Sequence, residues 1–347
     1  MRGFSRRLVL AFLLFLAVAS AATSLLAAPR SAPTRSRSGS FVSIHGIEYI
    51  STTEFASRYD LKAVWTTRGK RVAIIGGKTR VELEADARDC QVNSLRVLMG
   101  EPARLYRKTL YISKIDAERF IGPIIDPSLQ HSPRAAVRVV ALDAGHGGRD
   151  KGKVNDRLGV MEKTVTLDVV QRLKKILEAS GFKVVLTRSD DRYVELDDRP
   201  ALAKKAGADV FVSVHFNSVE TGAKRVTGVE VFSLTPQYQF STDDSQREAT
   251  DQARIFNPGN ANDALNSRLG YEIHRQIVHD LKVADRGHKR QRFKVLRLAE
   301  CPAVLIEGGY LSNDTEARKI ATASFRQNLA RSIADGVINF AELVKAK

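Results

Sequence analysis

The chain has few of the residues that build covalent or thiolate frameworks. It holds two cysteines in 347 residues, Cys90 and Cys301. Because they lie far apart in the sequence, they exclude a disulfide scaffold and a cysteine-rich structural metal site as the basis of the fold. We expect two separate buried thiols.

Long apolar runs are also scarce. The longest, residues 8–18, is too short to span a membrane comfortably. Three arginines precede it and the small residues 19–21 follow, as in a signal peptide with its basic start, apolar centre and cleavage site. We therefore predict a signal peptide over residues 1–28 and export to the periplasm, the cell wall or the medium, with no membrane attachment after cleavage. An uncleaved anchor is the alternative.

Acidic residues are in deficit. Lysine and arginine number 55 against 39 aspartates and glutamates, which gives a net charge of +16. Such a charge attracts polyanions of several kinds. Export, and the lack of aromatic residues interleaved with basic ones, argue against nucleic acid as the partner. An acidic cell-wall polymer fits both the charge and the expected location.

Composition divides the mature chain into three parts. Residues 29–40 are rich in Pro, Ser and Arg, and we expect a disordered basic linker there. Short β-type runs dominate residues 41–126 and predict a small α+β domain. A polar stretch follows, and strand and helix patterns then alternate over residues 137–345.

The small domain contains two similar segments. "GIEYISTTEFASRY" (46–59) and "KTLYISKIDAERFI" (108–121) each predict a strand ending in Tyr-Ile-Ser followed by a short helix. The order of these elements resembles the small domain at the N-terminus of copper amine oxidases. That resemblance implies no catalytic motif. A wall-binding or spacer module and a passive packing domain both remain open.

Alternating strands and helices predict an α/β fold for residues 137–345, with a mostly parallel sheet flanked by helices. The expected strands cover residues 138–143, 183–188, 209–215, 229–234, 293–298 and 303–309. The expected helices cover residues 162–180, 198–206, 262–282 and the C-terminal segment that carries Phe325 and Phe340.

Ionisable residues follow several of these strands. His146 comes just after the first strand, His215 ends the third, Glu307 lies near the end of the last, and Glu162 opens the first helix. Open α/β sheets place their sites at such strand ends. Two imidazoles and one carboxylate are the ligands of a catalytic zinc, and a second carboxylate would be the general base. Taken singly, these residues have other interpretations. His215 could be a core histidine, Glu162 an acid in the first turn of a helix, and Glu307 an exposed loop acid.

Longer motifs point to a family. Five blocks occur in this order: "ALDAGHGGRDKG", "GVMEKTVTLDVVQRLKKIL", "VVLTRSDDRYVELDDRPALAKKAGADVFVSVHFNS", "DRGHKRQRFKVLR" and "PAVLIEGGYLSNDTEARKI". Together they resemble the zinc-dependent N-acetylmuramoyl-L-alanine amidases, which cut peptidoglycan between muramic acid and the stem peptide. The resemblance covers residues 137–345. It implies that His146, Glu162 and His215 hold Zn²⁺ and that Glu307 is the catalytic carboxylate.

Four further residues stand in matching blocks: Asp143, Arg188, Arg199 and Asn217. We interpret Asp143 and Asn217 as residues that support the metal ligands or touch substrate, and Asp143 as placed to orient an imidazole. Arg188 and Arg199 are also expected to support the site or to touch substrate. The alternative for them is a structural ion pair with an aspartate among residues 190, 191 and 198.

The segment 236–262 is longer and more polar than a simple connection needs. We expect either a mobile flap at the substrate groove or an ordinary surface insertion. The expected protein is a monomer that acts on peptidoglycan, with an activator protein as a possible partner. Two alternatives remain: a zinc peptidase acting on small cell-wall peptides, and an inactive wall-binding protein.

Overall fold

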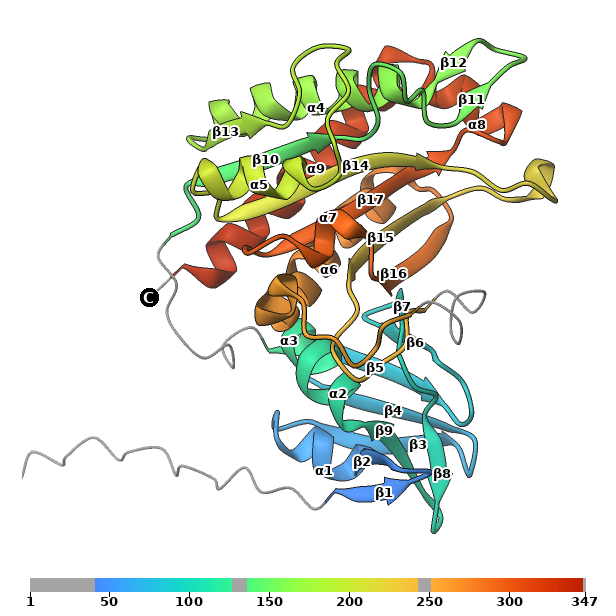
Figure 1. Ribbon diagram of the computed structural model, residues 1–347. Coiled ribbons are helices and arrows are strands. Elements are labelled where there is room, and N and C mark those ends of the chain that lie inside the picture. The colour runs from blue at the N-terminus through green and yellow to red at the C-terminus, as the bar shows by residue number, and fades with distance from the viewer. Residues whose placement is uncertain (1–40, 127–135, 243–250, 346–347) are drawn as a thin grey trace, which may run out of the picture. The chain divides into compact units, whose positions relative to one another are not determined.

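The computed structural model describes residues 41–126, 136–242 and 251–345 (Figure 1). The expected signal peptide (1–28), the linker (29–40) and nearly all of the expected boundary segment lie outside the described residues. Among those described, no helix is both long and apolar enough to cross a bilayer.

Residues 41–126 form strands and short helices, as expected for an α+β unit. Four strands pair in the order β1-β2-β9-β8, and β3 to β7 form an antiparallel meander. The elements are β1 (Val42–Ile44), β2 (Ile47–Ser51), α1 (Thr52–Ser57), β3 (Lys62–Thr67), β4 (Arg71–Gly76), β5 (Thr79–Glu84), β6 (Asp89–Val92), β7 (Leu95–Leu98), β8 (Arg104–Tyr106), β9 (Thr109–Ser113), α2 (Lys114–Asp116), the π-helical turn η1 (Ala117–Ile121) and α3 (Gly122–Ile125).

The two similar segments occupy equivalent places in this unit. β2 and β9 pair antiparallel, with Tyr49 opposite Ser113. The serine that ends each strand caps the helix that follows: Ser51 accepts from the amide of Glu54, and Ser113 accepts from the amide of Asp116. A serine at this position satisfies an amide that would otherwise lack a partner, which explains why Tyr-Ile-Ser leads into a helix twice.

Residues 136–345 form the expected α/β fold. The elements are β10 (Val139–Ala144), β11 (Val154–Asn155), β12 (Val160–Met161), α4 (Glu162–Ala179), β13 (Lys183–Leu186), α5 (Asp198–Lys205), β14 (Val210–Asn217), the 3₁₀ turn η3 (Ala223–Arg225), β15 (Val229–Leu234), the 3₁₀ turn η5 (Pro258–Asn262), α6 (Asp263–Leu281), β16 (Asp285–Gln291), α7 (Lys294–Arg297), β17 (Ala303–Tyr310), α8 (Asp314–Ile320) and α9 (Ala323–Val344).

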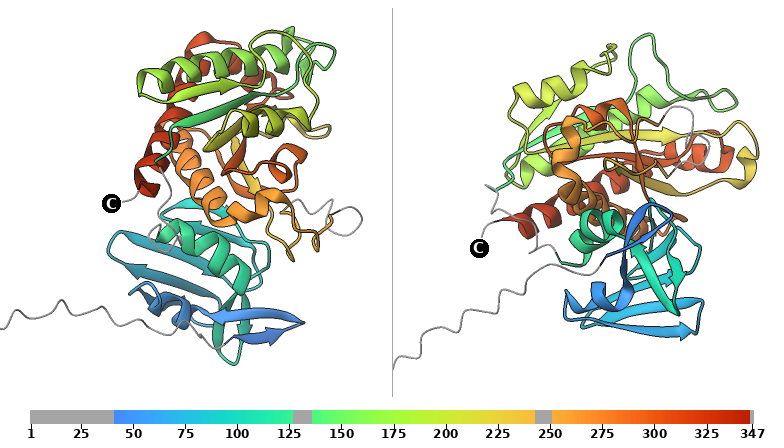
Figure 2. Two further views of the ribbon diagram at one scale, coloured as in Figure 1. Left: turned by 60° about the vertical axis from the view of Figure 1, so that its left-hand side comes forward. Right: turned by 60° about the horizontal axis from the view of Figure 1, so that its bottom comes forward.

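The sheet of this part is mostly parallel, as predicted, with strand order β13-β10-β14-β17-β15-β16 and one antiparallel pair, β15 with β17. Helices α4, α6 and α9 pack their apolar residues on one face, among them Leu173, Ile273 and Val337. On the other face α5 and α7 contribute Ala203 and Leu296 to a smaller core. Figure 2 shows the helices on both faces.

One expected strand is wrong, and three strands, β11, β12 and β16, were not expected. Residues 293–298 contain helix α7 rather than a strand, because the chain turns there to lay Val295 and Leu296 against the sheet. The polar run Asp285–Gln291 forms β16 instead. Its buried side chains are polar and bond to residues distant in sequence, His288 to Ser233 and Arg290 to Asp116, so the run lacks the apolar pattern of a core strand.

β16 also carries the sheet into the first unit. It pairs parallel with β7, where His288 lies opposite Val97, so that eleven strands form one sheet. A buried ion pair stands beside this junction: Arg290 Nη2 lies 2.6 Å from Asp116 Oδ1, and neither side chain is more than 1% exposed. A charge pair this deeply buried fixes the two parts in register, because either charge alone would be costly there.

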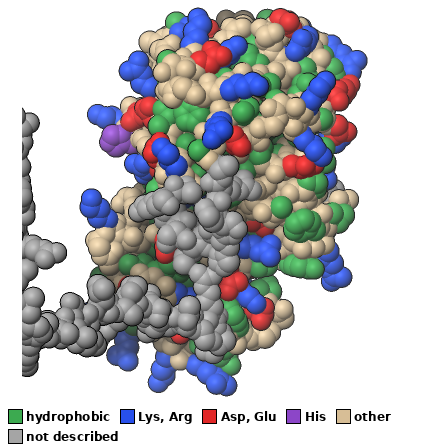
Figure 3. Space-filling model, turned by 90° about the vertical axis from the view of Figure 1, so that its left-hand side faces the viewer, with side chains coloured by type: hydrophobic (Ala, Val, Ile, Leu, Met, Phe, Trp, Pro, Cys, Tyr) green, Lys and Arg blue, Asp and Glu red, His purple; other side chains and the backbone are tan. Residues whose placement is uncertain are grey.

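One face of the molecule shows how its positive charge is arranged. On the face seen in Figure 3, lysine and arginine side chains lie scattered and often next to acidic ones. This face therefore has no single basic patch of the kind that tracks a nucleic-acid backbone.

Candidate functional site

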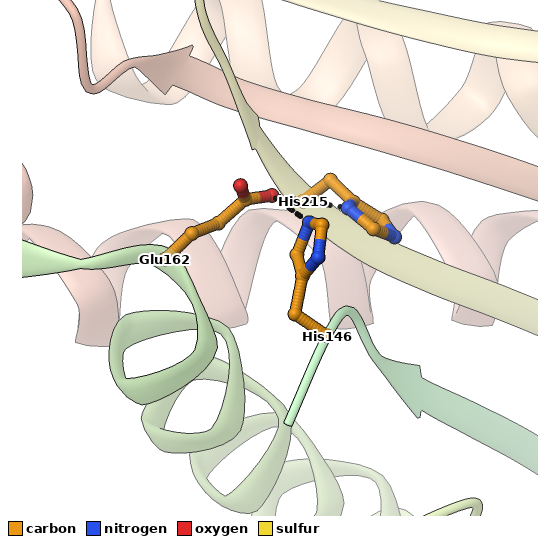
Figure 4. Close-up of side chains that lie close together, drawn as sticks. All are labelled: His146, Glu162 and His215. Atoms are coloured by element: carbon orange, nitrogen blue, oxygen red, sulfur yellow. Dashed lines mark hydrogen bonds and ion pairs between the residues drawn. The ribbon is translucent and has the colours of Figure 1, made fainter. Parts of the chain in front are cut away.

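The predicted metal ligands meet at one edge of the sheet. β10 and β14 are parallel, with Asp143 opposite Ser213, so His146 just beyond β10 and His215 near the end of β14 come to the same edge. Glu162 is the first residue of α4 and points between the two imidazoles (Figure 4). The structure thus brings together three residues that are far apart in the sequence.

Their ligand atoms converge. Glu162 Oε1 lies 3.0 Å from His146 Nε2 and 3.0 Å from His215 Nδ1, and the two imidazole centroids are 4.9 Å apart. One ligand atom from each of the three residues falls within a sphere where all are less than 4.8 Å apart. This spacing matches three protein ligands around one small cation.

Glu162 is held as an anion. Burial favours its neutral form, but hydrogen bonds with His146 and His215 keep the pKa of this carboxyl well below its usual value. The backbone amides of Phe216 and Lys153 donate to its two oxygens at 3.1 and 2.8 Å. A buried, ionised carboxylate fixed by backbone donors is well suited to ligate a metal.

Two glycines leave room for this cluster. A Cβ added to Gly145 would lie 2.3 Å from His215 Cε1, and one added to Gly152 would lie 2.6 Å from both Glu162 Oε2 and His146 Cδ2. His146 itself has φ +62°, in the left-handed region. The glycine-rich stretch therefore lets the backbone pass directly behind the ligands while it turns His146 toward them.

Asp150 was not among the predicted site residues. Its Oδ2 lies 2.8 Å from His146 Nδ1, which leaves Nε2 of the same ring directed at Glu162. Carboxylates commonly fix a ligating imidazole in this way. Its position four residues after His146, within the same turn, was the available signal.

Asp143 does not take the predicted role of orienting an imidazole. It is fully buried and accepts hydrogen bonds from Thr187, Ser213 and Arg199 at 2.6, 2.7 and 2.9 Å. Burial opposes its charge, yet Arg199 and the two hydroxyls hold the pKa of Asp143 below its usual value. Asp143 therefore stabilises the strand ends beneath the site and does not contact a metal ligand directly.

The two arginines are also buried. Arg199 pairs with Asp143 and donates to the carbonyls of Ala144 and His146. Arg188 donates to the carbonyls of Ala144, Gly145 and Lys163 at 2.8–2.9 Å. Neither makes the ion pair considered from the sequence with an aspartate among residues 190, 191 and 198; both brace the loop that carries His146.

Glu307 lies beside the cluster on β17, directly opposite His215 of β14. Burial, followed by the negative charges of Glu162 and Glu230, raises the pKa of its carboxyl well above the usual value. Its Oε2 is buried and has no hydrogen-bond partner among the described residues. An orphaned carboxyl oxygen next to three converging ligands is what a proton-transferring group at a reaction centre requires.

Asn217 lies two residues beyond His215 and donates from Nδ2 to Glu230 Oε2 at 3.1 Å. Glu230 was also missed from the sequence, where its strand looks like an ordinary core strand. On β15 it stands opposite Glu307, so His215, Glu307 and Glu230 form one row across three neighbouring strands. Side chains opposite one another in paired strands share a face, so the row defines one continuous polar surface.

The described part of segment 236–262 does not border this row. The chain leaves β15 at Leu234, four residues and about 13 Å past Glu230, away from the metal ligands. Arg292 Nη2 donates to the carbonyls of Pro236 and Gln239, and Gln239 donates to Ser113 and Asp116. These contacts attach the segment to the first unit, so the flap hypothesis finds no support in its position.

The donor set fits a zinc ion. It consists of two imidazoles and one carboxylate, and it includes neither cysteine. Three such ligands, with both imidazoles partly exposed to solvent and a second carboxyl group beside them, are typical of a catalytic rather than a structural zinc site.

Comparison with known proteins assigns the second part of the chain. Residues 140–339 match the family described as N-acetylmuramoyl-L-alanine amidase. The N-acetylmuramoyl-L-alanine amidase AmiA of Escherichia coli (strain K12) is 34% identical over 222 residues, which cover 58% of this chain and 76% of that protein. The sporulation-specific N-acetylmuramoyl-L-alanine amidase of Bacillus subtilis (strain 168) is 34% identical over 201 residues, covering 57% and 66%.

A solved structure agrees with this assignment. The crystal structure of N-acetylmuramoyl-L-alanine amidase from Clostridium difficile 630 superposes with a TM-score of 0.50 and 32% sequence identity. The match covers 60% of this chain and 98% of that one.

Proposed function

The chain belongs to the N-acetylmuramoyl-L-alanine amidase family, and from this premise we propose how its own side chains carry out the reaction. The enzyme hydrolyses the amide bond between N-acetylmuramic acid and the L-alanine of the stem peptide in peptidoglycan. We propose that His146, Glu162 and His215 hold a zinc ion and that Glu307 is the catalytic carboxylate. The observation that carries this proposal is the convergence of three ligand atoms within 4.8 Å.

A bound zinc ion would lower the pKa of water and polarise the carbonyl group of the amide. The protein's part is to hold the ligands still. Glu162 stays ionised through its backbone and imidazole hydrogen bonds, and Asp150 fixes the ring of His146. Behind them, Arg188 and Arg199 clamp the turn that carries His146.

Glu307 is the group that moves the proton. Attack of a water oxygen on the amide carbon releases one proton, which Glu307 accepts. As the carbon–nitrogen bond breaks, Glu307 returns that proton to the leaving amine of L-alanine. Burial raises the pKa of the Glu307 carboxyl, so it holds an accepted proton more firmly than an exposed glutamate would.

The test compares the wild-type enzyme with Glu307→Gln on purified peptidoglycan supplied with zinc. Mass spectrometry measures stem peptides that begin with a free L-alanine amine. We expect Glu307→Gln to release them about 10²–10⁴-fold more slowly, because general acid–base catalysis is lost. Glu300→Gln, which removes an exposed carboxylate paired with Lys204, is the matched control and should keep full activity.

Zinc content is measured on the same samples. Retained zinc with lost activity in Glu307→Gln supports the separate roles of ligand and base. Full activity in this variant would overturn the role of Glu307. Peptides cut within the stem by the wild type would indicate a zinc peptidase instead, and wild-type protein that binds the wall without releasing peptide would indicate an inactive binding protein.

The remaining proposals concern the rest of the chain. Action on cell-wall peptidoglycan implies export, and we propose residues 1–28 as the signal peptide. Residues 41–126 are proposed as a copper amine oxidase N-terminal-like domain that serves as a wall-binding or spacer module. An activator protein is a further proposal; the site of this chain is formed by its own residues.

A further inference from the structure

Glu230 gathers two cations beside the catalytic carboxylate. It is 3% exposed, and its Oε1 accepts from Lys289 Nζ at 2.8 Å, from Tyr310 OH at 2.8 Å and from Arg286 Nε at 3.1 Å. Asn217 occupies the other oxygen. One buried carboxylate thus holds two positive groups where a single one would balance its charge.

The surplus positive charge is open to solvent. The side chains of Arg286 and Lys289 are 35% and 22% exposed, whereas Glu230 is almost fully covered. Among the described residues, the side-chain hydrogen bonds of both cations run to Glu230, and the guanidinium of Arg286 lies 5.4 Å from the ring centre of Tyr310. The terminal nitrogens of Arg286 are therefore free to bind a further anion.

In the part of the chain that the structure describes, the nearby acids Glu316 and Asp285 bond to other groups. Glu316 also interacts electrostatically with Arg286, but its two oxygens accept hydrogen bonds from the backbone amides of Tyr310 and Gly228 at 2.7 and 2.8 Å. Asp285, next along β16, faces His274 at 2.7 Å. The cationic pair consequently has an unmet capacity for one negative group.

Its position relative to the reaction centre is set by strand register. Glu230 stands opposite Glu307 on β15 and β17, so their Cβ atoms are about 5 Å apart, and β16 lies one strand further from His215. A substrate held at Glu307 reaches the cations over roughly 7–10 Å, the length of about two or three extended residues. That separation fits a carboxylate on the residue that follows L-alanine in the stem peptide.

We propose that Arg286 and Lys289 form a carboxylate-binding subsite for the stem peptide, positioned by Glu230. The inference rests on the proposed roles of the metal ligands and Glu307. An arginine fork binds a carboxylate through paired hydrogen bonds and loses most of that attraction when the carboxylate becomes an amide. The subsite therefore selects substrates by the charge of this stem-peptide position.

The test uses two muropeptides that differ only at the residue after L-alanine, one with a free α-carboxylate and one with an α-amide. Steady-state kinetics with the zinc-loaded enzyme should give a lower KM for the free acid. Arg286→Gln should raise KM for the free acid about tenfold, with kcat within about threefold, and should leave the amide almost unchanged. Lys289→Gln should act in the same direction.

Matched controls separate this from a structural role. Arg71→Gln and Lys204→Gln each remove an exposed cation paired with a glutamate and should leave both substrates unaffected. Arg286→Lys, which keeps a charge beside Glu230, should preserve folding and part of the preference. If Arg286→Gln and Arg286→Lys impair both substrates equally, or if the wild type does not distinguish them, the subsite is refuted. If the wild type cleaves neither substrate nor peptidoglycan, the proposed chemistry fails instead.

Discussion

Arg199 Nη1 lies 2.9 Å from Asp143 Oδ1, and neither side chain is more than 2% exposed. This ion pair stands directly beneath the turn that carries His146, since Arg199 also donates to the carbonyls of Ala144 and His146. The charges are therefore part of the support of the site. Their burial makes each dependent on the other.

Replacing Arg199 by Gln should lower the free energy of unfolding by about 3–5 kcal/mol, because Asp143 is left as an uncompensated buried charge. Urea denaturation followed by circular dichroism measures this. Arg157→Gln breaks an ion pair with Asp314 in which the arginine is 70% exposed, and should cost less than about 1 kcal/mol. Equal losses in the two variants would contradict the special role of the buried pair.

Asp150→Asn should weaken zinc binding about 10–100-fold, because the carboxylate no longer fixes the ring of His146. Competition with a chromogenic chelator gives the affinity. Asp156→Asn changes an exposed acid in the adjacent hairpin and serves as the control. Unchanged zinc affinity in Asp150→Asn would show that His146 is oriented by the backbone turn alone.

Gly145→Ala should abolish zinc binding, since the new Cβ would fall 2.3 Å from His215 Cε1 and displace that ring. Zinc content of the purified variant measures this. Gly159→Ala is the control: its Cβ meets nothing within 4 Å, although its φ of +63° imposes strain. That variant should lose about 1 kcal/mol of stability and keep its zinc.

His288 should make the protein less stable in mild acid. Burial, together with the charges of His274 and Arg290, holds the pKa of His288 well below its usual value of 6.5. The unfolded chain therefore binds a proton at higher pH than the folded chain does. The contribution of neutral His288 to the free energy of unfolding is therefore fully present above about pH 6.5. As the pH falls below this value, the free energy of unfolding decreases by at most about 1.4 kcal/mol per pH unit.

Urea unfolding at pH 7.5, 6.5 and 5.5 tests this effect. His288→Asn should lose less stability between pH 6.5 and 5.5 than the wild type, whatever its absolute stability. His45→Asn, which alters an exposed histidine, should follow the wild-type slope. Identical slopes for His288→Asn and the wild type would exclude His288 as the source of acid sensitivity.

Much of the site was accessible from the sequence because parallel strands deliver their ends to one edge. His146, Glu162, His215 and Glu307 each stand at such an end or at the start of the helix that follows. Glu230 was not accessible, since a glutamate inside "VEVFSL" gives no sign that two cations on β16 meet it. The role of Glu230 depends on the antiparallel pairing of β15 with β17, and no local sequence pattern predicts that pairing.

β16 was missed for a related reason. Its residues Asp285–Gln291 are polar, and the partner that makes Arg290 tolerable in the interior, Asp116, lies 174 residues away. Hydrophobic periodicity identifies apolar side chains that can be buried. It does not show whether a distant residue will neutralise the charge of a buried polar side chain. The apolar run at residues 293–298 was mistaken for the strand because burial against α5 and the sheet gives a short helix the same composition.

The pairing of β16 with β7 also covers an edge of the catalytic sheet. Without residues 41–126, β16 would offer a row of unpaired backbone amides and carbonyls along an open edge, and such an edge recruits other chains. Arg290 would at the same time lose Asp116. Residues 41–126 therefore extend the catalytic sheet past β16, so that this strand is an interior strand and not an edge.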